Sequence, residues 1–513
     1  MNSKPMSPFQ RLPKWETPKS SSQWRTSIWS TLKSTLTSLT TLLPSPLLHL
    51  ISPDPSKTSH PSHQSTAYLD GIRGLAALTV YIQHYSAPFQ PGQIGDANRE
   101  SGKWSIFQYP IIRLFYSGSF AVALFFVISG FALSRKPLRL RYASAHHNDT
   151  QTQISKALLS LSSATFRRGI RIFIPPIVIV LLTMLGTHLH LFDSAPSILP
   201  ETLTENYNVS PPTRLPTFSA QLLDCLYYIA AHLIYPSQWM RAIPGTKSAN
   251  YGFQLWTIPM EFWASLVVFS VLGALVPVKS RGVRNGGVAL VILYAFWCSR
   301  WEISLFLSGS LLADLDLFLS PPPLPAPAGG PIIPLTSTSN PTPTPNRTNH
   351  TTLNQLLPPT LWTLTLLTGL YLGSTPEMNA ATTPGFTTLT KLTPHEETWH
   401  SLGAVLVILT ISRCRLLQKP LTTSLPQYLG RISFGLYLVH VPVLMWVGWT
   451  ATPGLWGVIG REGAVRYETG VVVGCLGVLV VVGWVADVFW RVVDAPCVRL
   501  GRVVEGWVFG VIA

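Results

Sequence analysis

Arg73 and His84 are separated by ten residues in an apolar stretch that begins near Ala67. Over this distance a helix makes about three turns, so the two side chains share one face and lie about 16 Å apart along the axis. Ionisable groups inside a membrane span are costly and therefore indicate function. Arginine suits an anionic group, and histidine suits proton transfer to or from a hydroxyl. The structural alternative is that Arg73 pairs with Asp70 while His84 bonds a neighbouring carbonyl.

Further ionisable residues lie in other apolar stretches. Glu261 follows Leu-Trp-Thr-Ile-Pro-Met and lies roughly 10 Å into its stretch. His440 ends the run Leu-Gly-Arg-Ile-Ser-Phe-Gly-Leu-Tyr-Leu-Val-His, so an arginine again precedes a deeper histidine. Arg167 and Arg171 are spaced i, i+4 and predict a basic rim. Together these residues suit a long substrate whose anionic head meets arginine and whose reactive end meets histidine.

The composition places these residues in a membrane protein. Charged residues make up 12% of the 513 residues and hydrophobic residues 47%, with a mean hydropathy of +0.29. Soluble globular proteins carry about twice that share of charge, so a soluble multidomain protein is excluded. The 17 Trp, 16 Tyr and 22 Phe suit anchoring at membrane interfaces. The formal charge of +15 is explained by the Lys and Arg excess of cytoplasmic loops, and we expect no nucleic-acid partner.

We predict an all-α polytopic membrane protein with about ten transmembrane helices (10–11) in one bundle. A span needs roughly twenty mainly apolar residues. The candidates are 67–86, 115–134, 171–192, 254–277, 285–300, 302–319, 358–374, 397–412, 429–449 and 468–490. The apolar stretch 222–235 is too short to span comfortably, and we expect it to be re-entrant or interfacial.

The chain divides by composition into a transmembrane domain and two tails. Residues 1–65 are rich in Ser, Thr, Pro and Lys and are expected to be a disordered or membrane-surface tail. Residues 66–500 form the transmembrane domain, in which 320–357 is a Pro/Thr-rich low-complexity loop, and 501–513 is a C-terminal tail.

Loop charges predict the orientation in the membrane. Lys and Arg are concentrated in the N-terminal tail and between the second and third candidate spans, which favours cytoplasmic N- and C-termini in an endomembrane or the plasma membrane. Asn208 is then the best glycosylation acceptor, because it lies in a loop on the far side. The sequons at Asn346 and Asn349 fall in a loop expected in the cytoplasm.

The five cysteines indicate neither a metal site nor a disulfide framework. Cys225, Cys298, Cys414, Cys475 and Cys497 form no CxxC pair. We therefore expect no bound metal.

Six sequence blocks resemble the acyltransferase-3 family of integral membrane O-acyltransferases, in the same order and spacing. They are DGIRGLAA, the Arg and His separated by ten residues, FFVISGF, RRGIRIFIPP, LWTIPMEF and LGRISFGLYLVH, and they extend from residue 67 to about 500. The sequence GSFAVAL resembles the fungal branch. The resemblance implies an acyltransferase transferring groups other than amino-acyl groups. It would move an acyl group, usually acetyl, from acyl-CoA to a hydroxyl of a small-molecule natural product or a glycan.

The resemblance also implies roles for individual residues. The family's Arg-x10-His motif falls on Arg73 and His84, its glutamate block on Glu261 (with Thr257 in place of Ser), and its late histidine on His440. Its RRxxR block falls on Arg167, Arg168 and Arg171. One departure is Ala123, where many bacterial members have Asp, so any role of that carboxylate is missing.

These assignments predict a mechanism without a permanently bound cofactor. Arg73, with the three arginines of the RRxxR block, would bind the phosphates of acyl-CoA as co-substrate at the cytoplasmic mouth. His84 would deprotonate the acceptor hydroxyl, with transient acylation of histidine as a competing role. Glu261 would either orient an imidazole or pair with a buried arginine. His440 would support His84 or be structural.

The alternative function is a membrane transporter or flippase of a small molecule or glycolipid, because embedded Arg, His and Glu also mark transport pathways. That function predicts inverted repeats with broken helices. The two halves of the sequence show no internal repeat, which favours the enzyme.

Overall fold

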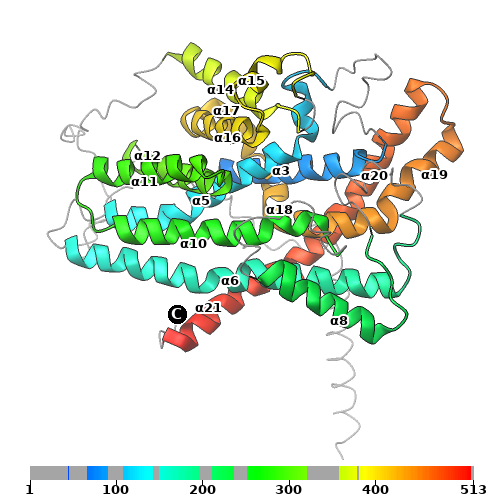
Figure 1. Ribbon diagram of the computed structural model, residues 1–513, viewed down its shortest axis with the longest axis horizontal. Coiled ribbons are helices and arrows are strands. Elements are labelled where there is room, and N and C mark those ends of the chain that lie inside the picture. Colours follow the sequence, from blue (N-terminus) through cyan, green and yellow to red (C-terminus); the bar gives the residue numbers. More distant parts are fainter. Residues whose placement is uncertain are drawn as a thin grey trace, which may run out of the picture. The chain divides into compact units, whose positions relative to one another are not determined.

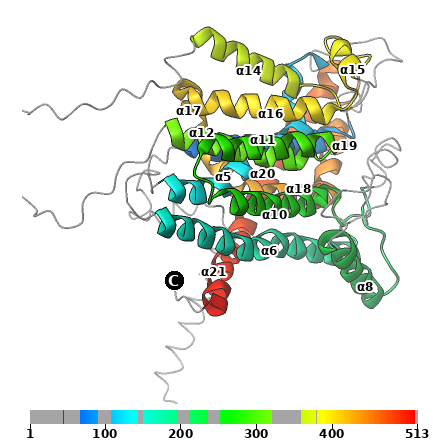
Figure 2. The ribbon, with the colours of Figure 1, turned by 60° about the vertical axis from the view of Figure 1, so that its left-hand side comes forward.

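The computed structural model describes Pro44 and residues 66–89, 108–142, 150–195, 211–235, 251–319, 358–377 and 380–509. Regular secondary structure in these ranges is helical throughout, as expected for an all-α fold (Figures 1 and 2). Apart from Pro44, the expectations for the N-terminal tail, the Pro/Thr-rich loop and the glycosylation positions Asn208, Asn346 and Asn349 fall on residues outside the described ranges.

Each of the ten segments selected by hydropathy lies on a helix. These helices are α3 (Ala67–Ser86), α5 (Gly118–Tyr142), α6 (Thr150–His188), α10 (Thr257–Leu275), α11 (Arg281–Trp297), α12 (Trp301–Leu319), α14 (Pro359–Gly373), α16 (Glu396–Arg413), α18 (Ser424–Val443) and α20 (Ala464–Phe489). Shorter elements lie between or after them: η3 (Ile112–Tyr116), α8 (Phe218–Tyr228), η5 (Ile229–Ile234), η6 (Phe253–Trp256), α15 (Thr387–Leu392), α17 (Arg415–Leu421), η7 (Leu444–Gly448), α19 (Trp449–Ile459), η8 (Trp490–Asp494) and α21 (Ala495–Phe509).

The expectation of ten membrane spans is wrong. Five stretches of the described residues are long and apolar enough to cross a membrane: Gly118–Tyr142, Thr150–His188, Phe253–Leu275, Ser424–Ile459 and Ala464–Phe509. A sixth would be α16 together with α17, which meet at a bend of 100°. The other candidates fall on helices that are shorter or more polar. α11 has 17 residues and α14 has 15.

The charges of α12 show why hydropathy miscounted the spans. Glu302, Asp314 and Asp316 all lie on this helix. The Asp314 side chain is only 3% exposed and accepts hydrogen bonds from Tyr142, Arg281 and Asn285. Groups on α5, α11 and α16 therefore satisfy Asp314 and Asp316, and Arg300 in the turn before α12 pairs with Glu302. Because these charges are satisfied inside the protein, the polarity of α12 need not match that of a lipid-facing span. The coarser prediction, a helical membrane protein, fits the structure.

α5 and α12 touch backbone to backbone through a reciprocal pair of glycines. A Cβ atom on Gly130 would lie 1.9 Å from the carbonyl oxygen of Phe306, and one on Gly309 would lie 2.1 Å from that of Val127. Small residues allow such approach between helices in a membrane, where packing replaces the hydrophobic effect as the driving force. The position of α5, which lines all three cavities described below, is fixed by this contact.

α3 and α18 are in similar contact and run in the same direction. A Cβ on Gly74 would lie 2.4 Å from the backbone nitrogen of Gly430, and one on Gly430 would lie 2.2 Å from the carbonyl oxygen of Asp70. Elsewhere α6 lies beside α10, and α14 beside α16 (Figures 1 and 2). The C-terminal α21 packs against α6, where Glu505 pairs with Arg167 at 3.0 Å.

Gly130→Ala is expected to lower the free energy of unfolding by about 1–3 kcal/mol, because the added methyl group forces α5 and α12 apart. The matched control is Gly477→Ala in α20, where a Cβ meets nothing within 4 Å. Thermal unfolding in detergent measures both. Equal melting temperatures for the two variants would contradict the close contact.

Candidate active site

His84 and His440 meet between α3 and α18. Each lies ten residues after the glycine at which the helices touch, Gly74 or Gly430, so the parallel helices bring both rings to the same height. His84 Nδ1 lies 2.8 Å from His440 Nε2, and the rings are parallel within 4°. The two histidines therefore form one hydrogen-bonded unit.

The hydrogen-bond partners define which ring nitrogen carries the proton. His440 Nδ1 lies 3.1 Å from the carbonyl oxygen of Leu436, which can only accept, so this nitrogen donates. In neutral His440 the lone pair is then on Nε2, which accepts from His84 Nδ1. The lone pair of neutral His84 consequently lies on its own Nε2. The network leaves His84 with the nitrogen that a general base needs.

Neighbouring groups hold His84 in place. The ring of Phe253 meets the His84 ring edge to face at 5.1 Å between centroids. The indole of Trp449 donates to the His84 carbonyl oxygen at 3.1 Å. His84 is half-buried, whereas His440 is fully buried.

Glu261 pairs with an arginine. Its carboxylate accepts a hydrogen bond from Arg168 Nη2 at 2.8 Å and one from Ser129 at 3.3 Å. Arg168 Nε also donates to Ser265 at 2.9 Å. Of the two roles open from the sequence, the contacts of Glu261 match pairing with a buried arginine, and its described hydrogen bonds include none to an imidazole.

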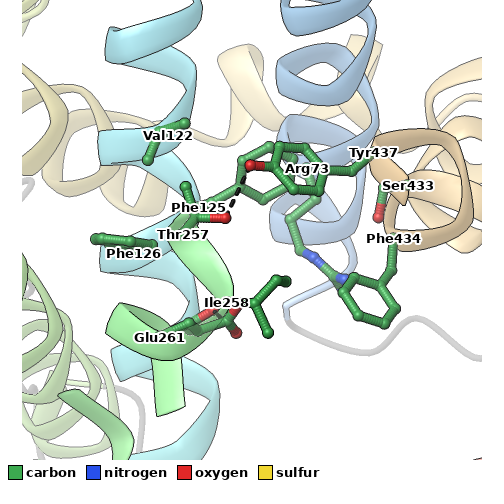
Figure 3. A pocket seen from close by; sticks show the side chains of 11 residues that line it. Arg73, Val122, Phe125, Phe126, Thr257, Ile258, Glu261, Ser433, Phe434 and Tyr437 are labelled. Carbon is green, nitrogen blue, oxygen red and sulfur yellow. Dashed lines mark hydrogen bonds between the residues drawn. The ribbon is translucent and has the colours of Figure 1, made fainter. Parts of the chain in front are cut away.

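Arg73, Glu261 and Tyr437 are among the residues that line a cavity of about 60 Å³, here called the central cavity. In Figure 3 the guanidinium of Arg73 lies beside the ring of Phe434, and Glu261 lies across the cavity. Arg73 also pairs with Asp70 at 3.3 Å. The Arg73 side chain thus reaches the same cavity as Glu261.

Tyr437 joins the central cavity to the histidine pair. Its hydroxyl donates to the carbonyl oxygen of Gln254, so the Thr257 hydroxyl, 2.8 Å away, donates to Tyr437 (Figure 3). The Tyr437 ring lies 5.9 Å from that of His440. Tyr437 is part of the block LGRISFGLYLVH, but the sequence alone does not show that its hydroxyl meets Thr257 at the central cavity.

A second cavity of about 210 Å³, the basic pocket, lies between α5, α6 and α21. Its basic lining residues are Lys136, Arg167, Arg168 and Arg171. Arg73 interacts electrostatically with Arg168, and Asp494 interacts with both Arg73 and Arg171. The four arginines expected to bind acyl-CoA therefore line the central cavity and the basic pocket, and Lys136 lines the basic pocket with them. The sequence offered Lys136 only as one of several loop charges.

A third cavity of about 470 Å³, the α16 cavity, is lined by α5, α10, α12 and the start of α16. Its lining includes Ala123, the position where the sequence departs from many bacterial members. In the described residues, no group of three or more His, Cys, Asp or Glu side chains could hold a metal ion.

Comparison with known proteins assigns the family. The chain belongs to the acyltransferase-3 family, described as an acyltransferase domain, which matches residues 66–487. The O-acetyltransferase PaAT-1 of Phomopsis amygdali is 28% identical over 460 residues, which cover 85% of this chain and 84% of that protein. The acyltransferase clz18 of Cochliobolus lunatus is 24% identical, and the acyltransferase R4 of a Phoma species is 25% identical, each over 84% of this chain and 94% of its own length. No solved structure matches. The resemblance to the acyltransferase-3 family is confirmed.

Glu261→Ala is expected to lower the free energy of unfolding by about 3 kcal/mol, because it leaves the buried guanidinium of Arg168 without its carboxylate. Adding Arg168→Ala should recover part of the loss. Glu505→Ala is the matched control: its pair with Arg167 is more exposed, and the loss should stay below about 1 kcal/mol. Chemical denaturation in detergent measures all three. A loss for Glu261→Ala no larger than for Glu505→Ala would contradict the pairing.

Proposed function

We propose that this protein is a membrane-embedded O-acyltransferase that moves an acetyl group from acetyl-CoA to a hydroxyl of a small-molecule natural product or glycan. The observation that carries the proposal is the hydrogen-bonded pair of His84 and His440, with the lone pair of His84 on Nε2, in a chain of the acyltransferase-3 family. The termini are proposed to be cytoplasmic, so that the basic pocket faces the side where CoA is found.

The basic pocket supports an acyl-CoA donor. Guanidinium groups present fixed, forked donors that match phosphate oxygens, and an ammonium adds a point charge. Arg73, Arg171 and Lys136 would bind the phosphates, together with Arg167. Arg168 is already engaged by Glu261, so its share of phosphate binding is smaller.

The size of the central cavity supports a short acyl group. A volume of about 60 Å³ holds a few groups of the size of water. An acetyl group fits this space, and a long acyl chain does not. The name of the relative from Phomopsis amygdali, an O-acetyltransferase, points the same way.

His84 is proposed as the general base of a direct transfer. Its Nε2 takes the proton of the acceptor hydroxyl while the hydroxyl oxygen forms a bond to the thioester carbonyl carbon. The carbon–sulfur bond then breaks, and the same proton passes from the imidazolium to the leaving thiolate. His440 Nε2 accepts the Nδ1–H of His84 throughout and stabilises the imidazolium as a positioning residue.

His84→Ala is expected to lower kcat about 10²- to 10⁴-fold with little change in the KM for acetyl-CoA, because the proton acceptor of the transition state is lost. Release of CoA thiol and the mass increase of the acceptor measure the reaction in membranes. His190→Ala is the control, since His190 is exposed and pairs with Asp193. Normal folded yield with undiminished turnover in His84→Ala would contradict the mechanism.

Arg73→Ala should act differently from His84→Ala. Phosphate binding is similar in the ground and transition states, so its loss should mainly raise the KM for acetyl-CoA. Arg73→Lys should rescue only in part, because the ammonium lacks the forked geometry.

Movement of the acceptor across vesicles without a change in its mass would instead favour the transporter.

A further inference from the structure

The α16 cavity has the size of a site for an organic molecule. Its volume of about 470 Å³ falls within the range of roughly 300–1,000 Å³ seen for ligand pockets. The central cavity, at about 60 Å³, is too small for the body of a natural product or sugar. An acceptor therefore needs a larger space beside the reacting groups.

The α16 cavity and the basic pocket lie at opposite ends of α5. Ser119, Val122 and Ala123 in the first turns of α5 line the α16 cavity, and Lys136 near the other end lines the basic pocket. Lys136 follows Ser119 by seventeen positions on the helix, which corresponds to about 25 Å. Since α5 is long and apolar enough to cross a membrane, two substrates can approach from separate sides.

The α16 cavity and the central cavity adjoin at one residue. Val122 lines both. Phe126, which lines the central cavity, stacks on Trp301, which lines the α16 cavity, at 5.5 Å between centroids and 18° between planes. A molecule in the α16 cavity thus lies against side chains that also bound the central cavity.

The lining of the α16 cavity combines aromatic rings with carboxyl groups. Trp256 is 41% exposed and Phe296 is 37% exposed, and such rings bind flat apolar surfaces and cations. Arg300 is paired with Glu302 at 2.6 Å. The lining contains three carboxyl groups, those of Glu302, Glu396 and Glu397, against one guanidinium, that of Arg300, so anionic molecules are disfavoured there.

We propose that the α16 cavity binds the acceptor, and that it selects rigid, largely apolar hydroxyl compounds that are neutral or cationic over anionic ones. The apolar body packs against Trp256 and Phe296, and a second donor group of the acceptor meets Glu396 and Glu397. The hydroxyl to be acylated points past Val122 toward the histidine pair. This inference rests on the proposed function and assigns its second substrate.

Photolabelling with three probes of one skeleton tests the assignment in membranes containing the full chain. The probes are para-benzoylbenzyl alcohol (neutral), para-benzoylbenzylamine (cationic) and para-benzoylbenzoate (anionic). The alcohol and the amine should label peptides covering residues 296–302 and 393–400, and the carboxylate should label them at least about tenfold less, the equivalent of one partly buried charge pair. Mass spectrometry of the peptides measures the labelling.

The double variant Glu396→Gln, Glu397→Gln should remove most of the preference for the amine over the carboxylate. Glu462→Gln is the matched control, because it changes an exposed acid in the turn before α20 and should leave the preference unchanged. Equal labelling by the three probes, as in a cavity filled by lipid, would overturn the proposal, and so would a preference that survives the double variant.

The outcomes also separate this assignment from the proposed function. If His84→Ala stays fully active while the charge preference is present, the α16 cavity is a binding site but the mechanism fails. If His84→Ala loses turnover and the probes show no charge preference, the acceptor assignment alone fails.

Discussion

The site depends on the contact between α3 and α18. Gly74 and Gly430 have no side chains, so two parallel helices touch at their backbones, and the next ten residues of each helix end at a histidine. A Cβ atom at either glycine would lie within 2.4 Å of the other helix's backbone. A side chain there would therefore push the helices apart and break the 2.8 Å hydrogen bond between the histidines. The pairing of His84 with His440 is therefore a consequence of backbone packing about three turns away. The partners of the imidazoles, a carbonyl and a second imidazole, are then neutral, which suits a base that must remain unprotonated until the acceptor arrives.

Two buried charge pairs join different helices. Arg168 on α6 pairs with Glu261 on α10, and Asp314 on α12 pairs with Arg281 on α11. Leaving either partner alone in a low-dielectric interior would cost several kcal/mol. The Arg168–Glu261 pair joins α6 to α10 beside the central cavity. Arg73 pairs with the more exposed Asp70 and so has more freedom to meet a ligand.

The sequence predicts what is local and misses what depends on register. Arg73 and His84 share a face because helical periodicity is a property of one segment, and the ten apolar segments all proved to be helices. The meeting of His84 with His440 depends on where α3 touches α18, and no single segment encodes that. The count of membrane spans failed on helices such as α12, because hydropathy does not tell a charge facing lipid from one satisfied by a neighbour. Lys136 and Tyr437 were missed for the same reason, since their importance comes from residues distant in the chain.

The hydrogen bond from His440 to the carbonyl oxygen of Leu436 limits the route by which a proton can leave the histidine pair. Because the Nδ1 proton of His440 is tied to a carbonyl, a proton gained by His84 cannot pass through the pair and leave on its far side. It has to depart by the Nε2 through which it entered. The histidine pair therefore does not relay protons, and the proposed acyl transfer moves no net charge across the bilayer. The general-base step proposed for His84 would therefore not couple acyl transfer to a proton gradient through this pair.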